Sequence, residues 1–79
     1  MTQPEQTALK ILAEVCRVPQ DQLKPETRLV QDLGVDSVMT LDLLMELEEN
    51  LGIEIPEIDA AELVSVGKVL EYVRANAPT

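Results

Sequence analysis

The chain has 79 residues, a net charge of −9 and 46% hydrophobic residues, with Tyr72 as its only aromatic side chain. This length predicts one domain over residues 1–79, and the negative charge argues against nucleic acid and membrane surfaces as partners. A single cysteine excludes an intramolecular disulfide, and no signal peptide or membrane-spanning segment is recognisable. We therefore expect a cytoplasmic monomer with an aliphatic core that repacks easily.

The first helix is predicted from Pro4 to Cys16. Thr2 and Glu5 have the spacing of a capping box, and Pro4 suits a first helical turn. Apolar residues recur at helical spacing at Ala8, Leu9, Leu12, Val15 and Cys16. Because Cys16 lies on this stripe, we interpret it as a small core residue and not as a nucleophile.

A long ordered loop is predicted to follow, up to residue 36. Pro19 and Pro25 prevent a continuous helix there. The loop also contains three isolated apolar anchors, Leu23, Leu29 and Leu33. Loops of this length without regular structure are usually functional or well packed by their own side chains.

The second helix is predicted from Ser37 to Asn50 or Leu51, with Gly52 in a position that favours a left-handed cap. One stripe of this helix, flanked by Glu46, contains Val38, Asp42, Met45 and Glu49, whereas the side expected to face the core contains Leu41, Leu44, Leu47 and Leu51. The first stripe mixes apolar residues with carboxylates, as a surface that recognises a partner would. Alternatively, Val38 and Met45 merely widen the core face. Glu48 is counted with the candidate partner-binding residues.

The rest of the chain predicts an extended piece, one helical turn and a last helix. Pro56 blocks a helix after Gly52, and Asp59 is expected to cap the short turn formed by DAAEL. Ser65 is expected to cap the last helix, which has apolar residues at Val66, Val69, Leu70 and Val73. The predicted fold class is all-α, a small bundle of three main helices plus one short helix, with a long loop between the first two helices.

The charges are unevenly distributed. Between residues 29 and 67 the chain has no Lys or Arg but ten carboxylates, at Asp32, Asp36, Asp42, Glu46, Glu48, Glu49, Glu54, Glu57, Asp59 and Glu62. Such a run is either a solvated face that keeps a small protein soluble or a docking face for basic partners.

Most catalytic chemistry is excluded by the residue inventory. The chain has no His and one Cys, so it lacks the commonest general base and cannot build a thiolate zinc site. The acidic segment does not match the spacing of a calcium loop, and no glycine-rich phosphate loop is present. We expect no metal site and no enzymatic activity.

Ser37 remains as a candidate for chemistry. A serine at a helix start is usually a cap that accepts a hydrogen bond from a free amide. Asp36 directly before it can take that capping role, which would leave the Ser37 hydroxyl free. At a helix entrance, the unpaired amides and the positive end of the helix dipole favour a phosphate on that hydroxyl.

The run DLGVDSVMTLDLLMELEENLGIEIP closely resembles the acyl carrier proteins, in which Asp-Ser precedes the second helix. The resemblance extends over the whole chain, including the long loop and the closing VLEYV. It implies that a phosphopantetheinyl transferase attaches phosphopantetheine from coenzyme A to Ser37, and that the thiol of this arm holds acyl groups as thioesters. It also implies that Asp36 supports the modifying enzyme through its metal ion, and that Gly34 sets the turn into the helix.

The resemblance implies partners as well: the transferase, and acyl-transferring and chain-elongating enzymes with basic docking patches. Val38 stands where leucine is more usual in the family, and Met39 where the fatty-acid carriers often have an acidic residue. The subtype therefore stays open between a general fatty-acid carrier and one dedicated to a polyketide, lipid-modification or aminoacyl pathway. The competing class is an acidic helical interaction adaptor that is never modified.

Overall fold

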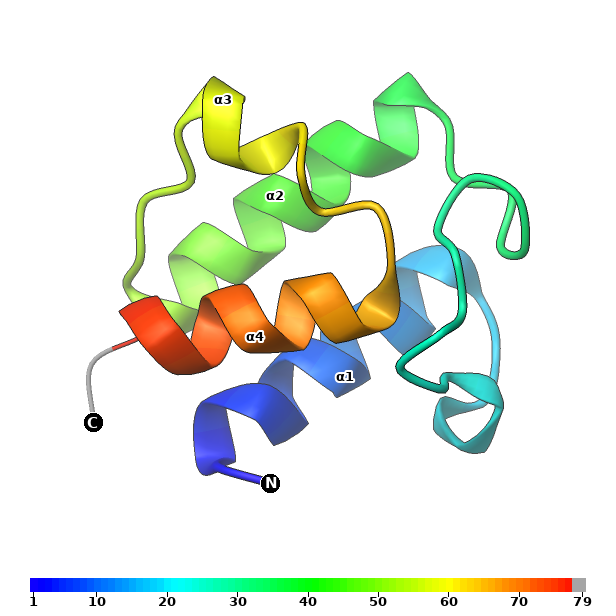
Figure 1. Ribbon diagram of the computed structural model, residues 1–79, viewed down its shortest axis with the longest axis horizontal. Helices are drawn as coiled ribbons and strands as arrows, with labels where there is room; N and C mark the ends of the chain where they lie inside the picture. Colours follow the sequence, from blue (N-terminus) through cyan, green and yellow to red (C-terminus); the bar gives the residue numbers. More distant parts are fainter. Residues whose placement is uncertain (78–79) are drawn as a thin grey trace.

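The computed structural model describes residues 1–77 and has the predicted architecture (Figure 1). Its elements follow in the order α1 (Gln3–Cys16), η1 (Gln20–Gln22), α2 (Ser37–Leu51), α3 (Glu57–Ala60) and α4 (Val66–Asn76), where η1 is a 3-10 helix. The expected all-α bundle of three main helices and a minor one is thus confirmed. No helix among residues 1–77 has the length and apolar character needed to cross a membrane.

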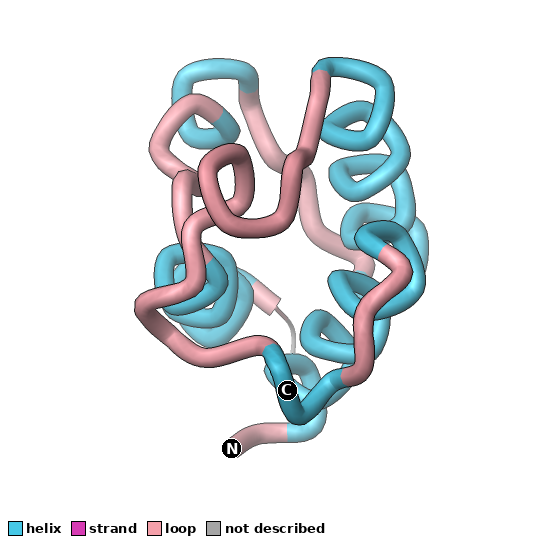
Figure 2. Tube along the Cα trace, turned by 90° about the vertical axis from the view of Figure 1, so that its right-hand side faces the viewer, coloured by secondary structure: helices cyan, strands magenta, loops and turns pink. Residues whose placement is uncertain are grey.

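Helix α1 forms the base of the bundle. It packs against both α2 and α4, while α3 lies beyond α2 at the opposite edge (Figure 1). The long first loop closes one end of the bundle, and Figure 2 views the molecule from that end, with the loop in front of the helices. The residue that starts α2 is therefore presented at the same end as the loop.

The core is aliphatic, as the composition predicts. Its fully buried side chains include Leu12, Leu47, Val66, Val69 and Val73. The loop anchors Leu23 and Leu29 are buried as predicted, whereas Leu33 is only partly buried. Cys16 is a buried free thiol whose pKa is raised by burial, which fits its interpretation as a core residue.

Helix α1 begins with the predicted capping box. The Glu5 N–H donates to Thr2 Oγ1 over 3.3 Å, and the Thr2 N–H donates to Glu5 Oε1 over 3.0 Å. The Thr2 hydroxyl also donates to Glu5 Oε1, over 2.9 Å. These hydrogen bonds, that of the Thr2 backbone first, hold the pKa of Glu5 below its ordinary value, and the side chain is buried. Glu5 is therefore a structural residue and not part of the acidic surface.

Backbone hydrogen bonds join the first loop to the start of α4. The Leu29 N–H donates to the Val64 carbonyl over 3.1 Å, and Arg28 and Ser65 form an isolated antiparallel bridge. On the other side of that bridge, the Val66 N–H donates to the Thr27 carbonyl over 2.9 Å. We call these contacts between the loop and the start of α4 the splice. They explain how a long loop, whose regular structure is the short helix η1, is held against the bundle.

The splice continues at Gly67, whose N–H donates to the Pro25 carbonyl over 2.9 Å. A Cβ at this position would also lie 2.9 Å from that carbonyl oxygen. Such an approach is too close for a side chain, so either the loop or α4 would have to move. Gly67 therefore occurs inside a helix because the loop backbone lies against it.

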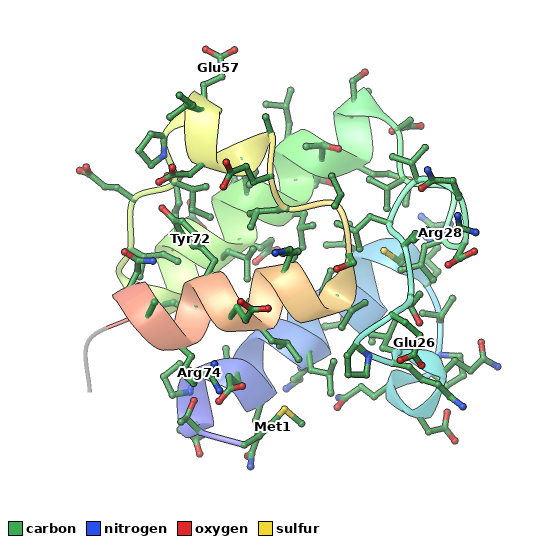
Figure 3. The ribbon with its side chains drawn as sticks, in the orientation of Figure 1. Met1, Glu26, Arg28, Glu57, Tyr72 and Arg74 are labelled. Atoms are coloured by element: carbon green, nitrogen blue, oxygen red, sulfur yellow. The ribbon has the colours of Figure 1, made fainter. Side chains whose placement is uncertain are left out.

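The short helix differs from its prediction. It begins at Glu57 and not after Asp59, its N-cap is Pro56, and none of its residues is buried. Asp59 instead accepts a hydrogen bond from the Tyr72 hydroxyl at Oδ2 over 2.9 Å, and the Glu54 carbonyl lies 3.2 Å from the same hydroxyl. In Figure 3, Tyr72 extends from α4 toward this region. The predicted cap was wrong because the Asp59 carboxylate is used in a tertiary contact that no local pattern shows.

Replacing Gly67 by alanine tests the splice. Alanine is favoured over glycine inside a helix by about 1 kcal/mol. We nevertheless expect Gly67→Ala to lower the free energy of unfolding by about 1–3 kcal/mol, because the added methyl group meets the Pro25 carbonyl. Chemical denaturation measures the change. Ala75→Gly, at an exposed position of the same helix, calibrates the propensity term alone. A stabilised Gly67→Ala variant would contradict the close approach.

Candidate functional site

Ser37 is the first residue of α2 and is exposed to solvent. Asp36 is the N-cap: its Oδ1 accepts the Met39 N–H over 2.8 Å, and its carbonyl accepts the Thr40 N–H over 2.9 Å. The prediction that Asp36 takes the capping role is therefore confirmed. The Ser37 hydroxyl is not needed as a cap and lies at the entrance of a 15-residue helix.

The residues just before Ser37 form a turn, which we call the strap (residues 28–35). Gly34 has a φ of +70°, in the left-handed region that glycine adopts without strain. Leu29 and Val35 are buried on either side of the turn, and the Val35 N–H donates to the Leu29 carbonyl over 3.0 Å. The expected role of Gly34 in the turn toward α2 agrees with this conformation.

The predicted partner residues mostly lie on one surface of α2. Val38 and Met45 are 69% and 56% exposed, and Asp42, Glu46 and Glu49 are also exposed. The alternative that Val38 and Met45 widen the core face is therefore wrong. We call the surface formed by Val38, Asp42, Met45, Glu46 and Glu49 the α2 face.

Glu48 lies apart from the α2 face. Its side chain is partly buried, and its Oε2 accepts the Ile55 N–H over 2.8 Å. This contact ties the segment after α2 back onto the helix. Glu48 therefore has a structural role, and its predicted contact with partners stays a prediction.

Leu41 was assigned to the core, and that assignment is wrong. It is 62% exposed, whereas Leu43 and Leu47 are buried and define the inward face of α2. At about 100° per residue, Leu41 falls beside Val38 and Met45 and far from Leu47. A helical wheel centred on Leu43 and Leu47 would have placed Leu41 on the exposed side of α2. Leu41 adds exposed apolar surface next to the α2 face.

An apolar cavity of about 180 Å³ lies on the other side of α2. Leu43 and Leu44 of α2, the strap residues Leu29 and Val35, and the segment from Ala60 to Val64 contribute to its lining. The cavity is thus bounded by the same strap that leads to Ser37. The sequence predicted a soft core but gave no sign of this cavity, since one of its walls comes from residues 60–64, which are distant in the chain from the strap and the start of α2.

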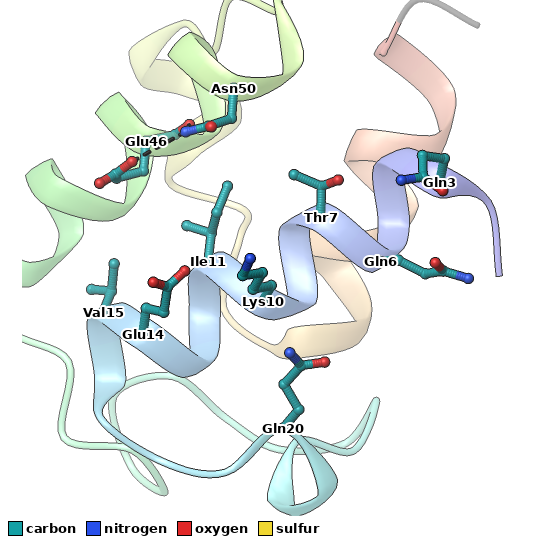
Figure 4. Close-up of a pocket in the computed structure, with 10 residues that line it drawn as sticks. All are labelled: Gln3, Gln6, Thr7, Lys10, Ile11, Glu14, Val15, Gln20, Glu46 and Asn50. Carbon is teal, nitrogen blue, oxygen red and sulfur yellow. Dashed lines mark hydrogen bonds between the residues drawn. The ribbon is translucent and has the colours of Figure 1, made fainter.

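A larger, polar groove of about 650 Å³ lies between α1 and α2. Figure 4 shows Glu46 and Asn50 of α2 across from Thr7 and Ile11 of α1. Ser37 does not line it. Within residues 1–77 there is also no group of three or more His, Cys, Asp or Glu side chains placed to hold a metal ion.

The geometry at Ser37 suits a covalently attached phosphate. The hydroxyl is exposed. Asp36 already accepts the Met39 and Thr40 N–H groups, but the N–H groups of Ser37 and Val38 have no acceptor within the helix, so they can face an anion. The sequence profile of a family described as the phosphopantetheine attachment site matches residues 6–73, which is well over half of the chain. The chain therefore belongs to this family of carrier-protein domains, to which phosphopantetheine is attached covalently. Carrier domains of this family are not themselves catalytic.

The cap at Asp36 gives a test of local structure. Asp36→Ala should lower the free energy of unfolding by about 1 kcal/mol, because the Met39 N–H loses its acceptor. Asp36→Asn should keep most of the stability, since asparagine caps helices about as well as aspartate. Denaturation of both variants measures this. Equal losses would mean that the negative charge and not the hydrogen bond stabilises the helix start.

Proposed function

We propose that Ser37 is the residue that carries phosphopantetheine and that the chain transports acyl intermediates for biosynthetic enzymes. The observation that carries the proposal is the pairing of Asp36 and Ser37: one residue caps α2, and the other offers an exposed hydroxyl in a chain of the carrier family. Coenzyme A is the donor of the arm, and a phosphopantetheinyl transferase is the first partner. When bound, the arm supplies a thiol that holds the acyl group as a thioester.

The pathway belongs to the proposal too. We place the carrier in fatty-acid biosynthesis or a related specialised pathway that builds polyketide, lipid or aminoacyl products. The apolar cavity beside α2 supports an aliphatic cargo, because it offers a carried chain a place away from water. The cytoplasmic, monomeric state predicted from the sequence stays a prediction.

The partners we propose have basic docking patches. The α2 face begins one residue after Ser37 and combines exposed carboxylates with exposed apolar side chains. Among residues 1–77 the Arg28–Asp32 pair is the one ion pair, so the carboxylates of α2 have no cationic partner within this part of the chain. Such a surface attracts basic partners over a distance and then offers Val38 and Met45 for close packing.

Modification of Ser37 is tested by intact mass and by labelling with coenzyme A analogues. The unsubstituted chain, incubated with a broad-specificity transferase, should gain the mass of one arm, and Ser37→Ala should gain none. Ser65→Ala is the matched control because Ser65 is the other serine of the chain. Its hydroxyl caps α4 by accepting the Lys68 N–H over 3.2 Å, so this variant should still be labelled. An unmodified chain that still binds partners would support the adaptor class instead.

The α2 face is tested by reversing one charge. Glu49→Lys should slow modification of Ser37 through slower association, and the penalty should shrink as salt rises, because screening weakens the lost attraction. Glu71→Lys changes the net charge equally at an exposed site of α4, away from the α2 face. Stopped-flow or initial-rate measurements compare the two. If both variants slow the reaction alike, overall charge matters and the α2 face does not.

A further inference from the structure

The strap holds its shape through a compact set of backbone hydrogen bonds. The N–H groups of Asp32 and Leu33 donate to the Arg28 carbonyl over 3.1 and 3.2 Å, and the Gly34 N–H donates to the Val30 carbonyl over 3.1 Å. The buried side chains of Leu29 and Val35 fix its two ends. Since Asp36 and Ser37 follow directly, the shape of the strap determines where the Ser37 hydroxyl is presented.

Arg28 and Asp32 close this turn with their side chains. The Arg28 backbone N–H donates to Asp32 Oδ2 over 2.8 Å and its Nε donates to the same oxygen over 3.3 Å. Its Nη2 lies 3.2 Å from Asp32 Oδ1. These hydrogen bonds, those from the guanidinium first, hold the pKa of Asp32 below its ordinary value, so the carboxylate is charged at neutral pH. We call this pair the clamp; Arg28 is labelled in Figure 3.

The exposure of the clamp argues against a role in global stability. The side chains of Arg28 and Asp32 are 59% and 40% exposed, and exposed ion pairs contribute little to folding. Yet this is the one ion pair among residues 1–77, in a chain whose charges are mostly of one sign. The pair instead restricts the conformation of the strap, because its three hydrogen bonds tie residues 28 and 32 together.

We propose that Arg28 and Asp32 are positioning residues that hold the strap in the conformation in which the modifying enzyme receives Ser37. This inference rests on the proposed function. If the strap spends only a fraction of its time in the competent conformation, the apparent affinity for the enzyme falls by that fraction. Loss of the clamp therefore raises the KM for the carrier and leaves kcat at saturation unchanged.

A pure charge effect predicts a different outcome. Arg28→Gln makes the chain more negative, so a transferase with a basic patch would bind it faster if only charge mattered. The clamp predicts that Arg28→Gln slows modification, although it removes a positive charge. The sign of this one effect separates the two explanations.

The experiment uses the full apo chain, a purified phosphopantetheinyl transferase and coenzyme A. Arg28→Gln and Asp32→Ala should each lower kcat/KM by about three- to tenfold, through KM, as expected for a competent fraction of roughly 0.1–0.3. The double variant should be no slower than the slower single variant, because both substitutions break the same contact. The matched controls are Lys24→Gln and Glu26→Ala, which make the same charge changes at exposed positions of the same loop.

Amide hydrogen exchange of the apo chain gives a second measurement that does not depend on any enzyme. In both clamp variants the Gly34 and Val35 N–H groups should exchange faster, whereas amides of α1 and the thermal midpoint should stay unchanged. If Asp32→Ala does not fold, Asp32→Asn replaces it, since its amide oxygen can still accept the Arg28 N–H.

Three results would overturn the proposal: faster modification of Arg28→Gln, rates equal to those of the controls, or effects that multiply in the double variant. If the unsubstituted chain is modified at Ser37 and the clamp variants behave like the controls, this inference alone fails. If the unsubstituted chain is not modified at Ser37, the proposed function fails together with it.

Discussion

The arrangement of the molecule depends on the splice between residues 25–29 and the start of α4. It provides hydrogen-bond partners for backbone groups of a loop that has almost no regular structure of its own. The close approach of the two backbones requires a glycine at position 67. Because the loop is fixed there, Leu29 and Val35 can be buried as anchors of the strap. The strap then sets the start of α2. A contact between two segments that are distant in the chain, such as the Leu29 N–H with the Val64 carbonyl, thus decides where Ser37 lies.

Asp36 caps the start of α2, and Ser37 next to it presents a free hydroxyl. One side chain could not do both. A capping hydroxyl would be committed to an amide of the helix, as that of Ser65 is to Lys68. At α2 the carboxylate of Asp36 takes the cap, and the hydroxyl next to it stays exposed at the positive end of the helix. The two helix starts differ in this respect, although each has a serine.

Much of this could be read from the sequence, and the misses share one cause. The capping box at Thr2 and Glu5, the bounds of α2 and the cap at Asp36 are local, so spacing alone predicted them. Asp59 and Leu41 were misplaced because tertiary packing decided their roles, as where the Asp59 carboxylate accepts the hydrogen bond of the Tyr72 hydroxyl. The contact of Glu48 with the Ile55 N–H was likewise not visible in the sequence, while its predicted contact with partners stays a prediction. The exposure of Leu41 depends on how α2 is turned against α1, which the even spread of its leucines leaves ambiguous. The splice and the cavity join distant segments and have no local signature.

Helix α2 combines an exposed serine at its start, an exposed acidic and apolar surface and a buried face, and this combination constrains its charges. Lysines placed beside its carboxylates could form i,i+4 pairs and relieve the repulsion that a net charge of −9 imposes. Under the proposed function, however, such pairs would neutralise the carboxylates that attract a basic partner. The same reasoning explains why the ion pair lies in the strap and not on α2: Arg28 and Asp32 shape the approach to Ser37 without covering the α2 face. Stability has therefore to come from the aliphatic core and the splice, both of which lie away from the surface that a partner would contact.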